Sequence, residues 1–201
     1  MPLSPDFVLA LAAQCAHGVA PATMLAVVRA ESALDPFAIG VNGPKAPRTA
    51  ARSAAEAVAT ARGLLRAGHD LDLGLAQINV RNLSRLGLSL DGAFDPCRNL
   101  AAGARVLGDG YARGVARHGP GQSALRVALS YYNTGHAQRG FANGYVARVA
   151  AQAGLRSEPG ERPALAAAAA APAPLMADAF GRAGGARLTA SFVLTPLGAT
   201  P

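Results

Sequence analysis

Residues 21–36 read PATMLAVVRAESALDP, an apolar run that leads into a glutamate and ends at a proline. Pro21 is typical of the first turn of a helix, and apolar residues recur at helical spacing through residues 24–28. Pro36 closes the segment, because proline disfavours a helical conformation in the residue before it. The stretch therefore predicts a buried helix with Glu31 in its last turn or two, where apolar neighbours oppose a charged carboxylate.

The other secondary-structure elements are marked by capping residues, prolines and glycines. Helices are predicted at residues 5–18, 53–68, 96–117, 121–132 and 144–152. Short strands are predicted in FAIGVNGPKAPRTA (residues 37–50), around the turn signal Asn42-Gly43, and in the alternating stretch LDLGLAQINV (residues 71–80). The expected fold class is α+β, mostly α, with a small β-ribbon.

Composition divides the chain into two parts. The chain has 201 residues, and one domain usually has about 100 to 200, so residues 1–156 are expected to form a single domain. Residues 157–201 are rich in Ala, Pro and Gly and contain few large apolar side chains. We expect a flexible tail there; the alternative is a short docking helix near residues 164–180 that folds on a partner.

The charge pattern bears on nucleic acid and membranes. The formal net charge is +7, but arginines are scattered among Ala and Gly, with no aromatic platform or recognition motif around them. We therefore expect no nucleic-acid role. No apolar stretch reaches the roughly 18 residues that cross a bilayer, and the first positive charge is Arg29, so we expect neither stable membrane insertion nor a signal peptide in the printed chain.

Cys15 and Cys97 are the only cysteines. They are too few for a disulfide scaffold and lack the spacing of metal ligands, so we expect no metal and no cofactor. They form either two buried thiols or one bridge. A bridge closing a loop of about 80 residues would stabilise the fold by roughly 4 kcal/mol in an oxidising compartment.

Glu31 is a candidate general acid. Only Glu31 and Glu56 precede residue 157, and Glu56 is explained by a capping box with Ser53. A carboxyl group at the end of an apolar helix has its charged form disfavoured by desolvation, which raises its pKa into the range useful for proton donation. The alternative is a surface residue paired with Arg29.

Three further stretches carry polar and aromatic groups that suit a sugar. GLAQIN (residues 74–79) places Gln77 and Asn79 on one face of the predicted strand, and amides both donate to and accept from hydroxyl and acetamido groups. SYYNTG (residues 130–135) ends a helix, and GYVARV (residues 144–149) follows it. Three of the four tyrosines lie in these last two stretches.

Four features of the chain, in their order along the sequence, resemble the motifs of the soluble lytic transglycosylase family. They are Glu31-Ser32, GLAQIN, YNTG (residues 132–135) and Tyr145. The resemblance covers roughly residues 7 to 150. It implies a lysozyme-like fold with the β-ribbon beside the active-site cleft, and cleavage of the glycan strands of peptidoglycan.

Three more phrases look like the subgroup that accompanies type IV secretion and conjugation machinery. They are LAAQCAHGVAPATM (residues 11–24), AIGVNG (residues 38–43) and FDPCRNL (residues 94–100). This resemblance implies a periplasmic protein, a bridge between Cys15 and Cys97, and secretion components as partners of the tail. The missing export signal departs from the subgroup; a trimmed or misannotated start and another export route both account for it.

The resemblance also implies roles for individual residues. Glu31 is expected to protonate the bond between N-acetylmuramic acid and N-acetylglucosamine and then to help close an anhydro ring. Tyr131 is expected to pack rather than to bind. The expected substrate-binding residues are Ser32, Gln77, Asn79, Tyr132, Asn133 and Tyr145.

Two other functions stay open at the level of sequence. A hydrolytic muramidase needs a second acid to activate water, and Asp70 and Asp72 are in position to supply it. Solvated positions at a turn or strand edge are the alternative for these aspartates. A non-enzymatic glycan-binding assembly factor would use the same binding residues without turnover.

Overall fold

The computed structural model describes residues 1–43, 46–47 and 49–153, so the predictions for residues 157–201 lie outside it. The longer helices are α1 (Pro5–Cys15), α2 (Pro21–Ser32), α3 (Ala54–Arg66), α5 (Pro96–His118), α6 (Gln122–Thr134) and α8 (Tyr145–Gln152). Single turns of helix are α4 (Leu83–Leu86) and α7 (Arg139–Ala142), and the 3₁₀ turns are Val80–Asn82 and Gly92–Phe94. The strands are β1 (Ile39–Asn42), β2 (Asp70–Leu73) and β3 (Ile78–Asn79). The predicted mostly helical α+β architecture is confirmed.

Helix α2 passes through the middle of the molecule. All six residues from Thr23 to Val28 are buried, so this helix packs on every side rather than on one face. Its end is set by Ala33, whose left-handed φ of 51° turns the chain out of the helix while its N–H still bonds to Val28. Glu31 therefore lies in the last turn, as the sequence predicts.

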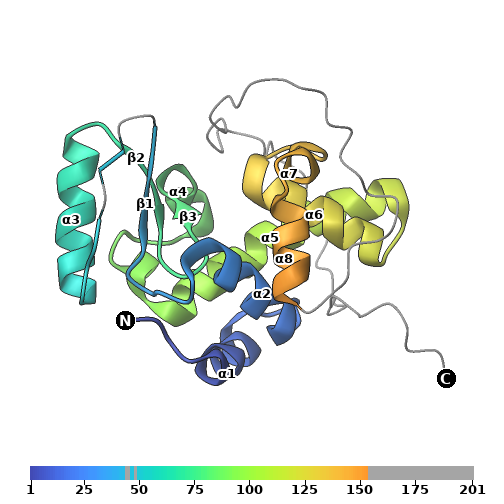
Figure 1. Ribbon diagram of the computed structural model, residues 1–201, viewed down its shortest axis with the longest axis horizontal. Coiled ribbons are helices and arrows are strands. Elements are labelled where there is room, and N and C mark those ends of the chain that lie inside the picture. Colours follow the sequence, from blue (N-terminus) through green and yellow to red (C-terminus); the bar gives the residue numbers. More distant parts are fainter. Residues whose placement is uncertain (44–45, 48, 154–201) are drawn as a thin grey trace.

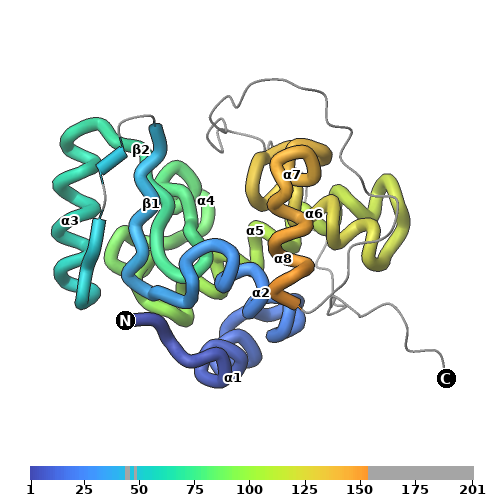
Figure 2. The backbone as a smooth tube through the Cα atoms, in the orientation of Figure 1, coloured from blue at the N-terminus to red at the C-terminus, as the bar shows by residue number. Residues whose placement is uncertain are grey.

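Two apolar clusters organise the packing. The first, which we call the helical lobe, is built around α1, α2, α5, α6 and α8. The second, the sheet lobe, packs α3 against the sheet through Val58, Leu71, Leu73 and Phe94. Figure 1 shows the sheet lobe at one end of the molecule and α6 to α8 at the other, with α2 between them. The trace in Figure 2 runs from α2 directly into β1. The end of α2 consequently lies where the two lobes meet.

The sheet differs from the prediction in two places. Strand β1 pairs antiparallel with β2, from Ile39 opposite Leu73 to Asn42 opposite Asp70, so α3 separates the paired strands and Asn42-Gly43 does not close a local hairpin. The predicted strand over residues 71–80 is also wrong at residues 74–77, which form a turn between β2 and β3. Period-two alternation cannot distinguish one strand from two short strands flanking a tight turn.

A disulfide joins Cys15 at the end of α1 to Cys97 at the start of α5, with a Cα–Cα distance of 5.4 Å. It ties the first helix to the longest one. Within the described part of the chain, no helix is both long enough and apolar enough to cross a membrane.

Candidate active site

Glu31 and Tyr145 meet between α2 and α8. The Tyr145 hydroxyl donates a hydrogen bond of 2.5 Å to Glu31 Oε1. Helices α2 and α8 pack against each other, and Tyr145 is 2% exposed, so the tyrosine reaches the glutamate from inside the core. Burial raises the pKa of Tyr145 well above its ordinary value, which keeps the hydroxyl a donor. The carboxyl group is thereby fixed in one orientation, while the Glu31 residue itself stays partly exposed.

The surroundings of Glu31 favour its neutral form. Burial raises the pKa of Glu31 from 4.5 to about 7, against the opposing effect of the Tyr145 hydrogen bond. The negative charge of Asp72 contributes to this rise, and the positive charge of Arg148 opposes it. A carboxyl group with a pKa near 7 is protonated in half of the molecules at neutral pH, as a general acid requires.

The turn at residues 74–77 is clamped by Asn99, which is fully buried on α5. Asn99 Oδ1 accepts from the N–H of Ala76 at 2.7 Å, and its Nδ2 donates to the carbonyls of Leu73 and Ala93 at 2.9 and 2.8 Å. A Cβ atom on Gly74 would lie 2.3 Å from the Ala93 oxygen, so only glycine fits there. One amide side chain therefore fixes the path of the GLAQIN segment.

Gln77 and Tyr132 also hold this turn in place. Gln77 adopts a left-handed φ of 47°, and its Nε2 donates to the carbonyls of Gly74 and Ala38 at 2.9 and 3.3 Å. The Tyr132 hydroxyl donates to the Ala76 carbonyl at 2.6 Å, and its ring is 2% exposed. Both side chains donate to backbone carbonyls, and these hydrogen bonds position the turn beneath the site.

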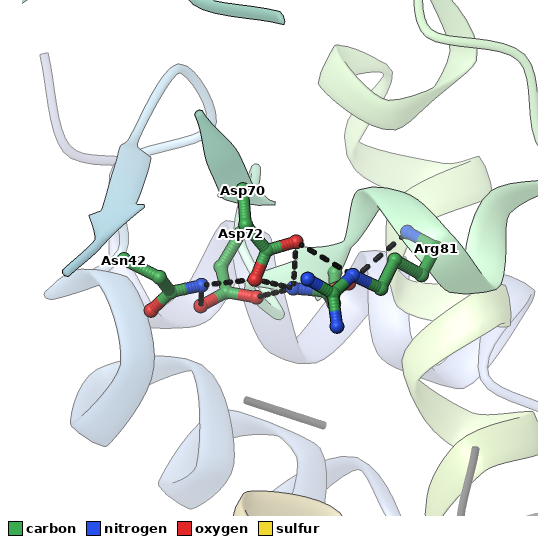
Figure 3. A network of polar contacts seen from close by, with 5 residues as sticks. Asn42, Asp70, Asp72 and Arg81 are labelled. Atoms are coloured by element: carbon green, nitrogen blue, oxygen red, sulfur yellow. Dashed lines mark hydrogen bonds and ion pairs between the residues drawn. The ribbon is translucent and has the colours of Figure 1, made fainter. Parts of the chain in front are cut away.

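A polar network lines the sheet at β2 (Figure 3). Asp70 and Asp72 lie two residues apart and thus on one face of the strand, and Asn42 Nδ2 donates to both, at 3.2 and 3.0 Å. Asn79 Nδ2 donates to Asp72 at 2.9 Å and to Asp70 at 3.2 Å. Arg81 forms an ion pair with Asp70 at 3.3 Å. Two carboxylates are thus held side by side by two amides and one guanidinium group.

Burial raises the pKa of Asp72, and its hydrogen bonds to Asn79 and Asn42 oppose that rise. Because Asp72 acts on the pKa of Glu31, its charge belongs to the surroundings of the candidate acid. Among the described residues, no group of three or more His, Cys, Asp or Glu side chains could hold a metal ion.

The opposite side of the site is formed by α6 and α8. Asn133 Oδ1 accepts from Asn143 Nδ2 at 2.8 Å, and Asn143 Oδ1 accepts from the N–H of Tyr145 at 3.0 Å. The Asn143 carbonyl accepts from Arg148 Nη1 at 3.2 Å. Ser32 lies next to Glu31 on α2, and its hydroxyl donates back to the Val28 carbonyl at 3.1 Å.

The sequence predictions and the structure overlap in part. The structure joins Glu31 directly to Tyr145 and places Asn79 on the same network as Asp72, but Asn79 is 1% exposed. The guanidinium group of Arg113 lies over the ring of Tyr131, with its carbon 5.4 Å from the ring centroid. Sequence reasoning missed Asn42, Asn99, Asn143 and Arg148. Asn99 could have been recognised as an amide among the apolar positions of the predicted helix at residues 96–117. The other three residues have no local signal in the sequence.

Comparison with known proteins bears on this geometry. Residues 9–153 match the family described as "Transglycosylase SLT domain". The chain is 42% identical over 157 residues to the type IV secretion system protein virB1 of Brucella abortus, covering 75% of this chain and 66% of that one. It is 44% identical over 138 residues to protein virB1 of Agrobacterium fabrum, covering 69% of this chain and 56% of that one. The chain thus spans less than two thirds of the length of these relatives. No solved structure matches it significantly.

Proposed function

Because this chain belongs to the transglycosylase SLT domain family, we propose that it is a peptidoglycan lytic transglycosylase. Its substrate is the β-1,4 bond between N-acetylmuramic acid and N-acetylglucosamine, and Glu31 is its catalytic acid. The observation that carries the proposal is the hydrogen bond from Tyr145 to a carboxyl group whose pKa is raised to about 7.

The reaction needs one carboxyl group acting twice. Neutral Glu31 gives its proton to the glycosidic oxygen, the C1–O bond to the leaving N-acetylglucosamine breaks, and positive charge develops at C1 of the muramic acid. The carboxylate of Glu31 then takes the proton of the muramic acid's C6 hydroxyl as that oxygen bonds to C1. The product is a 1,6-anhydro ring, no water is consumed, and Glu31 is neutral again.

Neighbouring residues support both steps. The Tyr145 hydroxyl holds one carboxyl oxygen and leaves the other to exchange the proton. Asp72 acts electrostatically on Glu31, and its negative charge would stabilise positive charge that develops beside that residue. We assign direct substrate binding to Ser32 and Asn133. Gln77 and Tyr132 support binding through the turn they hold, and the buried Asn79 and Tyr145 support it through Asp72 and Glu31, to which they donate.

Mass analysis of digested peptidoglycan tests the bond outcome. Sacculi incubated with the protein should release muropeptides that end in 1,6-anhydro-muramic acid, which lack one water relative to hydrolysis products. Reducing muramic acid ends would contradict transglycosylation.

Hydrolysis is the second candidate reaction, and one observation favours it. Asp72 lies close enough to Glu31 to act on its pKa, and its own pKa is raised, so it has the charge properties of a base that could activate water. Reducing ends that disappear in Asp72→Asn would support this candidate.

Replacement of Glu31 separates an enzyme from a glycan-binding assembly factor. Glu31→Gln keeps the shape and a hydrogen-bond acceptor for Tyr145 but has no proton to give. We expect cell-wall clearing to fall about 10²-fold to 10⁴-fold while binding to sacculi is kept. Equal clearing by both proteins would disprove the catalytic assignment.

The biological setting follows from the relatives. The Brucella relative is named a type IV secretion system protein, and we propose that this chain opens the cell wall locally for assembly of such a secretion or conjugation apparatus. We place the protein in the periplasm, where peptidoglycan lies. The Cys15–Cys97 disulfide supports this proposal, because disulfides persist in oxidising compartments.

A further inference from the structure

Arg148 holds a positive charge at the edge of the site, fixed by two contacts. Its guanidinium carbon lies 5.6 Å from the ring centroid of Tyr145, the tyrosine that donates to Glu31. Its Nη1 donates to the Asn143 carbonyl at 3.2 Å. Arg148 is exposed and follows Tyr145 by three residues, so both lie on one face of α8. The guanidinium group therefore has one aromatic contact and one backbone contact, while the residue stays exposed.

Among the described residues, Arg148 forms no ion pair, although its charge acts on the carboxyl group of Glu31. The ion pairs within the described residues join Arg62 to Asp91, Arg81 to Asp70, and Arg85 to Asp109. Arg148 is thus a cation on α8 that has no ion-pair partner among the described residues. An arginine presents several N–H groups in a planar fork that fits a carboxylate.

The positive charge of Arg148 opposes the neutral form of Glu31 that the proposed reaction needs. Positive charge at Arg148 lowers the pKa of Glu31 and so removes part of the neutral acid at pH 7. The other titratable groups that act on Glu31 are Asp72 on β2 and Tyr145 on α8, with Tyr132 on α6 also near.

We propose that Arg148 binds a carboxylate carried by the muramic acid branch of the substrate, and so selects strands that bear one. The inference rests on the proposed function. Peptidoglycan offers two such carboxylates: those of the stem peptide, and the free lactyl carboxylate of strands without peptide. N-acetylglucosamine oligomers offer none. When the substrate carboxylate pairs with Arg148, the positive charge of Arg148 no longer acts on Glu31. Glu31 therefore keeps its proton to higher pH in the bound complex than in the free protein.

Binding measurements in the Glu31→Gln background test this without any turnover. The probes are soluble glycan strands with stem peptides, the same strands stripped of peptide by an amidase, and an N-acetylglucosamine oligomer of equal length. We expect Arg148→Gln to weaken binding about tenfold for carboxylate-bearing probes and to leave the oligomer unchanged. Loss on the first probe alone identifies the stem peptide, and loss on the second probe alone identifies the lactyl group. Loss on both means that Arg148 accepts either carboxylate.

Arg113→Gln is the matched control, because Arg113 also lies over a tyrosine ring, at 5.4 Å, but on α5. It should change none of the three affinities. Arg148→Lys should keep part of the binding and Arg148→Glu should abolish it. Equal affinities of parent and Arg148→Gln for all probes, or equal losses on all three, would overturn the proposal. Failure of the parent to form anhydro ends would instead contradict the proposed function and leave these affinities intact.

A kinetic signature accompanies the binding result. With peptide-bearing strands, the alkaline limb of kcat should lie at higher pH than the limb of kcat/KM, because only the bound complex has Arg148 paired. The separation should vanish in Arg148→Gln. An unchanged separation would contradict the coupling.

Discussion

At the scale of single residues, the balance of charges around Glu31 sets the pH range of the proposed reaction. Burial and Asp72 raise the pKa of Glu31, while the Tyr145 hydrogen bond and Arg148 lower it. Activity should therefore fall as pH rises through about 7, where the acid loses its proton.

Two substitutions should move this limit in opposite directions. Asp72→Asn removes a negative charge and should shift the alkaline limb of kcat/KM to lower pH. Tyr145→Phe removes a hydrogen bond that favours the carboxylate and should shift it to higher pH. The measurement is the pH profile of muropeptide release. Shifts in the same direction would mean that Glu31 does not control the limb.

The same pKa makes a prediction about stability. Since the folded pKa of Glu31 is raised from 4.5 to about 7, its contribution to the free energy of unfolding is complete below pH 4.5 and is lost as pH rises to about 7. Glu31→Gln has no charge to bury. Urea unfolding should find this variant more stable than the parent at pH 8 by about 1 to 2 kcal/mol. The difference is smaller than the full pKa shift implies, because water screens the partly exposed carboxylate.

The comparison at pH 4 is the control for that prediction. There Glu31 is neutral in both the folded and the unfolded protein, so the two proteins should differ little. A stability difference that is the same at pH 4 and pH 8 would show that the glutamine acts through packing and not through charge.

At the scale of elements, the turn between β2 and β3 depends on Asn99. Asn99→Ala would leave the Ala76 N–H and the Leu73 and Ala93 carbonyls buried without this partner. We expect a loss of about 3 kcal/mol in the free energy of unfolding, from the desolvation of these groups. Chemical denaturation measures it, and Asn82→Ala is the control because the Asn82 side chain makes no capping bond.

Asn99→Asp gives a sharper form of this test. It keeps the acceptor for Ala76 but turns a carboxylate oxygen toward two carbonyl oxygens. This variant should be at least as unstable as Asn99→Ala at neutral pH and should recover in acid, where the aspartate becomes a donor. Stability independent of pH would contradict the clamp.

The elements differ in how far the sequence predicts them. Helix α2 was predictable because its proline, apolar run and Asp35-Pro36 stop are local signals. The sheet pairing was not, because β1 finds β2 across the whole of α3. The sequence singles out Glu31 because it is a carboxylate at the end of an apolar helix. Tyr145 could be predicted only from the order of the motifs along the chain. The contributions of Asn99 and Arg148 depend on tertiary contacts that no local pattern encodes.

At the scale of the whole molecule, the Cys15–Cys97 disulfide connects residues 82 positions apart in the sequence. Replacing both cysteines by alanine should lower the free energy of unfolding by about 4 kcal/mol, mainly by releasing the unfolded chain. Thermal unfolding with and without reductant measures the effect. Because neither cysteine is among the residues assigned to the reaction, activity at 25 °C should persist while the protein stays folded.

The bond between Tyr145 and Glu31 spans 114 positions of the sequence. During synthesis, Glu31 leaves the ribosome long before its partner, so the growing chain carries an ordinary, mobile glutamate until α8 has been made and packed. The activity proposed for this chain therefore depends on synthesis having passed α8, and arrest or cleavage ahead of α8 yields a fragment without the oriented acid.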